Sequence, residues 1–116
     1  MPWDEDKPRK RRPPQRITEA NLEAAAGRYV QRFWGPSAAL KRVLNKRVAA
    51  AATWYGEDPT EGKELVEALI ARWIEAGVLN DGLVASERAR MMHERGLPLR
   101  VISQRLREKG LDEAHV

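Results

Sequence analysis

A pattern of apolar residues at helical spacing occurs twice in this chain of 116 residues, with an offset of 62 positions between the copies. The residue types match more often than the identities. The corresponding positions are Leu22 and Val84, Tyr29 and Met91, Val30 and Met92, Leu40 and Ile102, Leu44 and Leu106, and Arg47 and Lys109. A partly duplicated helical unit is typical of short repeat proteins, which build an extended surface more readily than an enclosed pocket.

Capping residues, glycines and prolines divide the chain into five expected helices. The first runs from about Thr18 to Trp34, the second is capped by Ser37, the third starts at Thr60, the fourth is capped by Asn80 or Asp81 and ends at Gly96, and the fifth starts at Pro98 and ends before Gly110. Residues 54–59 are expected to form a non-helical connection between the second and third helices. Gly77 suits the left-handed backbone position after the third helix. No stretch alternates with period two for long enough to form a strand. The expected fold is therefore all-α, a short tandem array of three-helix repeats with about five helices.

Apolar residues three and four positions apart share one face of each expected helix and predict the core. They are Leu22, Ala25, Ala26, Tyr29, Val30 and Phe33 in the first helix; Leu40, Val43, Leu44, Val48 and Ala51 in the second; Leu65, Leu69, Ile70, Trp73 and Ile74 in the third; and Val101, Ile102 and Leu106 in the fifth. Val78 and Leu79 are expected to reach the same core. Trp34 and Trp73 are also expected inside, and Trp54 is expected to be the more exposed tryptophan.

The composition predicts three segments of different character. Residues 1–16 contain four of the seven prolines and six basic side chains, so we expect a disordered basic tail. Residues 17–111 are expected to form the helical domain, with a first repeat at about 18–78 and a partial second repeat at about 79–111, and residues 112–116 a C-terminal tail. The chain has no cysteine, no apolar signal segment and no apolar run of the roughly 18 to 20 residues that span a bilayer. We therefore expect a cytoplasmic protein that does not bind membranes.

Charged residues alternate in sign along the chain. Residues 28–49 contain six bases and no acid, residues 57–81 contain seven acids and two bases, and residues 88–109 contain seven bases and two acids. An ordinary solvated face is one interpretation, but such faces usually mix signs, so the unopposed bases favour contact with an acidic protein or a phosphate backbone. The candidate contact residues are Arg28, Arg32, Lys41, Arg42, Lys46 and Arg47 in the first basic block and Arg100, Gln104, Arg107 and Lys109 in the second.

The sequence lacks the residue patterns of the common catalytic and metal sites. His93 and His115 are too far apart to form a helical metal pair, and no cysteine or aspartate cluster accompanies them. The three serines lack the glycines of a nucleophile elbow, and no glycine-rich turn follows a strand as a phosphate-binding loop requires. We therefore expect a protein that is not an enzyme and that has no cofactor, no metal and no small-molecule substrate.

Several short motifs follow one another between about residues 18 and 111. In chain order they are the pair Tyr29-Val30; a basic helix opened by Ser37 and spaced by Leu40 and Leu44; the turn Gly77-Val78-Leu79-Asn80-Asp81; Gly96 and Pro98; and a closing segment with Ile102, Leu106, Arg107, Lys109, Gly110 and Leu111. Their order and spacing resemble the RecX family, regulators of the RecA recombinase that are known as tandem three-helix repeats.

This resemblance implies a regulator that binds the RecA filament on single-stranded DNA and inhibits its recombinase, ATPase and coprotease activities in DNA repair and the SOS response. The basic faces of the second and fifth helices would contact the filament, and these faces and the basic tail would also contact single-stranded DNA. Two alternatives stay open. Arg100, Gln104 and Arg107 share one face of the fifth helix, as in a helix-turn-helix DNA-binding protein. The other alternative is a helical scaffold for an unrelated acidic protein.

Overall fold

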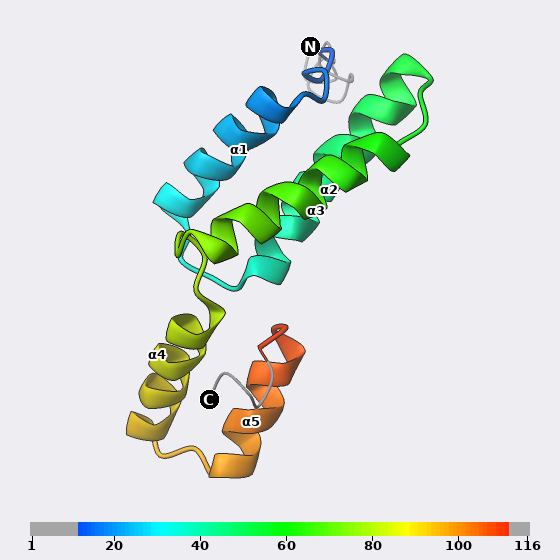
Figure 1. The fold of residues 1–116 in the computed structure, drawn as a ribbon. Coiled ribbons are helices and arrows are strands. Elements are labelled where there is room, and N and C mark those ends of the chain that lie inside the picture. Colours follow the sequence, from blue (N-terminus) through cyan, green and yellow to red (C-terminus); the bar gives the residue numbers. More distant parts are fainter. Residues whose placement is uncertain (1–11, 112–116) are drawn as a thin grey trace, which may run out of the picture.

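Five α-helices make up the described part of the chain, residues 12–111, in the computed structural model (Figure 1). They are α1 (Glu19–Arg32), α2 (Ser37–Tyr55), α3 (Thr60–Glu75), α4 (Asp81–Glu94) and α5 (Leu99–Glu108). Residues 12–111 contain no strand, so the all-α prediction is confirmed. Residues 1–11 of the predicted N-terminal tail and residues 112–116, the predicted C-terminal tail, lie outside the described residues.

The helices pack in two groups (Figure 1), and the buried side chains of each group form a separate core. α1, α2 and α3 contact one another around the larger core, whose buried residues include Leu22, Leu44 and Leu69. α4 and α5 contact one another beyond one end of this bundle, around a smaller core that includes Ile102 and Leu106. The described residues extend over 49 × 41 × 22 Å. This flattened shape leaves much of each helix exposed to solvent.

The helix boundaries repeat with the same offset of 62 residues as the apolar pattern. α1 and α4 both contain 14 residues, and α2 and α5 both follow a proline in an extended conformation. The side chains of Thr18 and Asn80 each accept a hydrogen bond from the backbone N–H three residues later, at N···O distances of 3.0 and 2.9 Å. Both residues are therefore confirmed as helix caps.

Two helix ends differ from the sequence-based expectation. α1 ends at Arg32, earlier than expected, because Phe33 already has an extended backbone. α2 continues through Trp54 to Tyr55, so the predicted break between α2 and α3 is shorter than expected. The alanines in the later turns of α2 favour a helix, and Gly56 with φ 66° provides the left-handed residue that ends it.

The turn after α3 folds back on the helix end. Gly77 has φ 81°, which confirms its predicted left-handed conformation. The backbone N–H groups of Val78 and Leu79 both donate to the carbonyl oxygen of Trp73, at 2.9 and 3.1 Å. This tight turn places Leu79 in the larger core, as predicted, but leaves Val78 exposed, so the prediction for Val78 was wrong.

Several residues of the predicted apolar stripes lie outside the core. The exposed ones are Phe33, Val43 and Ile74, and Trp34 is exposed as well, with 55% of its surface accessible. The buried residues of α3 are Gly62, Val66, Leu69 and Ile70. Leu65 and Trp73 are only partly buried at the edge of this face. The predicted stripes were too wide because three helices of this length cover only part of each apolar surface.

Gly62 lies where α3 approaches α2 closely. A Cβ atom at Gly62 would lie 2.7 Å from Cγ1 of Val48 and 3.3 Å from Cγ2 of Ile17. In α1, by contrast, a Cβ atom at Gly27 would meet no atom within 4 Å. Replacing glycine by alanine inside a helix normally stabilises a protein by about 0.5–1 kcal/mol. Forcing a methyl group into a packed contact costs about 1–3 kcal/mol. At Gly62 this steric cost should exceed the gain in helix propensity.

We therefore expect the same substitution to have opposite effects at the two glycines. Gly62→Ala should lower the free energy of unfolding by about 1–2 kcal/mol, and Gly27→Ala should raise it by about 0.5–1 kcal/mol. Urea unfolding of the two variants measures both changes. If both variants were stabilised, α2 and α3 would have room for a methyl group at their contact.

Candidate partner-binding surface

The outer face of α2 carries Arg42 and Lys46, two of the predicted contact residues. They are four residues apart, so they lie on the same side of the helix. Both side chains are exposed, and neither has an ion-pair partner among residues 12–111. This face of α2 therefore presents two unpaired cations to solvent.

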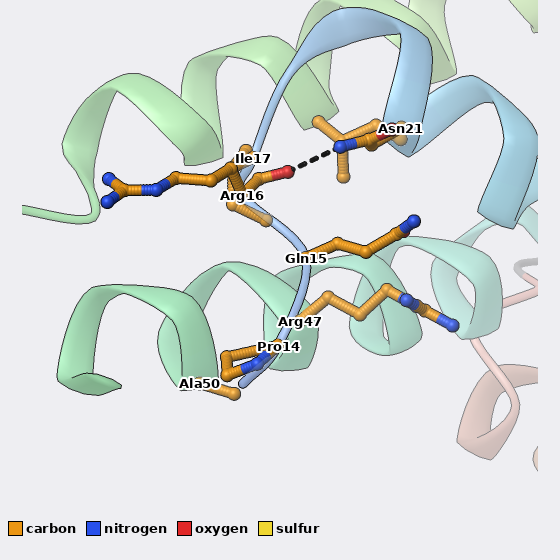
Figure 2. A pocket seen from close by; sticks show the side chains of 8 residues that line it. Pro14, Gln15, Arg16, Ile17, Asn21, Arg47 and Ala50 are labelled. Atoms are coloured by element: carbon orange, nitrogen blue, oxygen red, sulfur yellow. Dashed lines mark hydrogen bonds between the residues drawn. The ribbon is translucent and has the colours of Figure 1, made fainter. Parts of the chain in front are cut away.

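The two neighbouring cations of α2 have different surroundings. Lys41 forms an ion pair with Glu67 of α3. Arg47 lines a pocket of about 110 Å³ together with Gln15, between α2 and the chain that leads into α1 (Figure 2). The four predicted cations of α2 are thus divided between the outer face, the contact with α3 and this pocket.

Two residues assigned to the predicted tail, Pro14 and Arg16, contact the end of α2. The hydroxyl of Tyr55 donates to the carbonyl oxygen of Pro14 at 2.7 Å. The guanidinium of Arg16 lies 3.7 Å from the centre of the Tyr55 ring and pairs with Glu57 at 2.9 Å. The carbonyl oxygen of Arg16 accepts from the side chain of Asn21 at 2.8 Å, as Figure 2 shows. These contacts hold the chain before α1 against the bundle.

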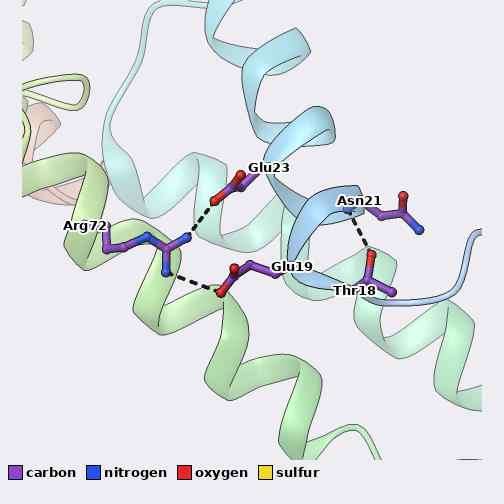
Figure 3. A network of polar contacts seen from close by, with 5 residues as sticks. All are labelled: Thr18, Glu19, Asn21, Glu23 and Arg72. Carbon is purple, nitrogen blue, oxygen red and sulfur yellow. Dashed lines mark hydrogen bonds and ion pairs between the residues drawn. The ribbon is translucent and has the colours of Figure 1, made fainter.

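Charges of both signs lie along α1. Near its start, Arg72 of α3 pairs with Glu23 at 2.9 Å and with Glu19 at 3.9 Å (Figure 3). Near its end, the predicted contact residues Arg28 and Arg32 are exposed, and the Arg32 guanidinium lies 5.5 Å from the centre of the Phe33 ring. The acids of α1 are therefore partly neutralised by α3, whereas its cations remain at the surface.

α5 places the predicted residues of the second basic block on two faces. Arg100, Gln104 and Arg107 are exposed, and their spacing of four and three residues puts them on one side of the helix. Lys109 instead lines a groove that α5 forms with α4. The structure therefore does not bring all four residues together.

This groove, of about 410 Å³, lies between α4, α5 and the connection from α1 to α2. Its lining includes four cations and two exposed apolar side chains, namely Arg88, Arg95, Arg105, Lys109, Met91 and Trp34. None of the four cations has an ion-pair partner within the described range 12–111. Arg88, Met91 and Arg95 were not among the predicted contact residues, although their spacing of three and four residues places them on one side of the helix.

Arg90, on another face of α4, is fully engaged within the chain. Its guanidinium pairs with the carboxylates of Glu87 and Glu94, the latter at 2.6 Å. The hydrogen bond from Arg90 holds the pKa of the Glu87 carboxyl below its ordinary value, and the same contact raises the pKa of Arg90. Arg90 therefore does not belong to the unpaired cations of the groove.

The two helical groups are joined by hydrogen bonds between Ser37 and Asp81. The carboxylate of Asp81 accepts from the backbone N–H of Ser37 and from its hydroxyl, both at 2.7 Å. Ser37 was predicted to cap α2, and this was wrong: the residue before the helix is Pro36, and Ser37 is the first helical residue. The acceptor at this helix start comes from α4 instead, where a carboxylate is favoured by the positive end of the helix dipole.

We expect Asp81→Ala to lower the free energy of unfolding by about 1–3 kcal/mol, because it leaves a partly buried backbone N–H without its acceptor. Ser37→Ala should cost about 1 kcal/mol, because the backbone N–H keeps its bond. The exposed Glu64 provides a control carboxylate, and Glu64→Ala should change stability by less than about 0.5 kcal/mol. Thermal unfolding of the three variants tests this order. Equal losses for Asp81→Ala and Ser37→Ala would argue against a role of the carboxylate in holding the backbone N–H.

The described part of the chain shows no grouping of three or more His, Cys, Asp or Glu side chains that would bind a metal ion. Its helices also include none with the length and apolar character needed to cross a bilayer.

Fold and surface together define a small all-α protein with exposed basic helix faces. Over 108 residues, the chain is 36% identical to the regulatory protein RecX of Myxococcus xanthus (strain DK1622), in an alignment that covers 91% of this chain and 58% of that relative. This similarity confirms the predicted resemblance and supports the assignment of the chain to the RecX family. The chain spans little more than half the length of that relative. No family model matches the chain, and no solved structure matches it.

Proposed function

We propose that this protein regulates the RecA recombinase by binding the RecA filament on single-stranded DNA and inhibiting its recombinase, ATPase and coprotease activities. The observation that carries the proposal is the similarity to a regulatory protein RecX along 91% of this chain. The protein would act in the cytoplasm as a binding protein rather than an enzyme, in DNA repair and the SOS response.

The unpaired cations of α2 support this function physically. Arg42 and Lys46 are exposed and lack carboxylate partners within residues 12–111, so an anionic partner does not have to displace an existing ion pair. A filament on DNA offers phosphates and the acidic surfaces of its protein subunits, and opposite charge speeds the association of such partners. We therefore propose the outer face of α2 as the main filament contact.

The outer face of α5 supplies a second proposed contact. Arg100, Gln104 and Arg107 are exposed on one side of this helix, which lies in the other helical group. Two contacts on separate groups allow the protein to touch two places on an extended partner. Single-stranded DNA is the partner proposed for the two exposed cations near the end of α1, Arg28 and Arg32, through non-specific phosphate contacts.

The test is the single-stranded-DNA-dependent ATPase of RecA from the same organism, titrated with this protein. We expect inhibition at fewer than one protein per RecA subunit, together with weak binding of the protein alone to DNA. The DNA-binding assay runs in parallel on single-stranded and duplex oligonucleotides. No inhibition, combined with tight and sequence-dependent duplex binding, would replace this proposal with a helix-turn-helix function. No effect in either assay would leave a scaffold for another acidic protein.

A further inference from the structure

The groove beside α4 combines an apolar wall with a rim of positive charge. Met91 and Trp34 line it and expose 45% and 55% of their surfaces. Arg88 of α4 and Arg95 at its C-terminal cap contribute charge on one side, and Arg105 of α5 and Lys109 at its C-terminal cap contribute it on the other. We infer that this groove binds an acidic peptide segment of a partner protein, with one apolar side chain of that segment inserted between Trp34 and Met91.

The positive charge of the groove favours a partner segment that carries negative charge. Four cations line it, no carboxylate does, and none of the four is paired within residues 12–111. Arg90 of the same helix, by contrast, forms ion pairs with Glu87 and Glu94. Cations gathered at one place without acids repel one another in the free protein. An occupant that carries carboxylates relieves this repulsion.

The apolar residues of the groove favour a partner segment that also carries an apolar side chain. Removing apolar surface from water is favourable, so the exposed side chains of Trp34 and Met91 favour an apolar occupant of the groove. Tryptophan is frequent at the centre of interfaces, and methionine adapts its shape to different occupants. The volume of about 410 Å³ accommodates a few side chains rather than a whole folded domain. A short segment with one apolar anchor and flanking acids meets these requirements.

A peptide fits this groove better than a nucleic acid does. Proteins that hold single strands use successive aromatic side chains on which bases stack. Among residues 12–111, Trp34 is the one aromatic residue of the groove lining, and the rest of the apolar wall is aliphatic or thioether, including Met92 and Leu106. Such a wall packs an aliphatic or aromatic side chain of a peptide more closely than a row of bases. The inference rests on the proposed function for the identity of the partner, since the acidic segment would belong to the regulated protein.

Fluorescence anisotropy with a defined probe tests the inference on the full-length protein. The probe is a fluorescein-labelled peptide of about 12 residues, in which Asp and Glu flank a central Leu-Phe pair. Two control peptides replace the acids by Lys or the Leu-Phe pair by Ser-Ser. We expect the acidic peptide to bind and both controls to fail. Equal binding of the Ser-Ser peptide, or no binding of the acidic peptide, would overturn the inference.

Variants locate the binding site. Arg105→Glu should weaken binding of the acidic peptide by about tenfold or more, and Trp34→Ala should also weaken it. Lys63→Glu makes the same change of charge on α3, outside the groove, and should leave binding within about twofold of the unchanged protein. Circular dichroism establishes that each variant is folded. If Arg105→Glu and Lys63→Glu weakened binding equally, the groove assignment would be wrong.

Other occupants give different results in the same assay. Binding of a thymidine oligonucleotide that is lost in Trp34→Ala, without peptide binding, would overturn the inference in favour of a nucleic acid. Residues 1–6 contain Trp3 followed by Asp4, Glu5 and Asp6, so the chain itself carries a segment of this chemistry. Peptide binding only after removal of residues 1–11 would overturn the assignment to a partner and identify this segment as the occupant.

The inference and the proposed function fail in distinguishable ways. If the peptide binds but RecA is not inhibited, the groove assignment stands and the proposed function fails. If RecA is inhibited normally by Arg105→Glu and no peptide binds, the groove assignment fails and the proposed function stands.

Discussion

Replacing Arg42 and Lys46 together by glutamate is expected to abolish the proposed inhibition of RecA while leaving the fold intact. Neither side chain has an ion-pair partner among residues 12–111, and the substitution replaces both cations by carboxylates that repel an anionic partner. Each reversal should weaken binding by at least about tenfold. Because both side chains are exposed, the melting temperature should stay within about 4 °C of the unchanged protein. The measurement is the RecA ATPase titration together with thermal unfolding by circular dichroism.

A matched control separates a local contact from the effect of net charge. Lys63→Glu on α3 changes the charge by the same amount as Arg42→Glu and lies on an exposed position outside the predicted contact residues. We expect Arg42→Glu to reduce inhibition and Lys63→Glu to leave it unchanged. Loss of folding in the double variant, or equal loss of inhibition in the two single variants, would argue against the outer face of α2 as the contact.

The second large effect is expected from Leu106→Ala, which removes a fully buried side chain from the smaller core. Leu106 is 1% exposed and belongs to a cluster of five buried residues, so its loss should cost about 2–5 kcal/mol. Because α4 and α5 have their own core, the damage should be concentrated there. Hydrogen exchange should become faster in α4 and α5 by roughly 100-fold, with a much smaller change in α1 to α3.

Two related substitutions make this test specific. Leu44 occupies the corresponding place in the larger core, so Leu44→Ala should accelerate exchange mainly in α1, α2 and α3. Leu99 of α5 is 72% exposed, so Leu99→Ala should change stability by less than about 0.5 kcal/mol. If Leu106→Ala accelerated exchange equally in all five helices, the two cores would unfold as one cooperative unit.

Much of the local structure was predicted correctly from short stretches of sequence. Thr18 and Asn80 cap α1 and α4, and Gly77 takes the left-handed conformation after α3. Each of these features depends on a residue and its neighbours within one turn, so local physical chemistry is sufficient to predict it. The all-α fold follows in the same way from the period of the apolar residues. The basic residues were also found by sequence, although the sequence did not show which of them share a surface.

Features that depend on contacts between distant residues were decided only by the tertiary structure. Ser37 has the residue type of a cap, yet its partner is Asp81 in another helical group. Lys41 has an ion-pair partner because α3 places Glu67 beside it. Trp34 was expected in the core but is exposed beside the groove. Spacing along one chain segment was therefore sufficient to predict the five helices, the caps at Thr18 and Asn80 and the inventory of charges. Which side chains are buried, paired or left free depends on how the helices pack, and that was decided by the tertiary structure alone.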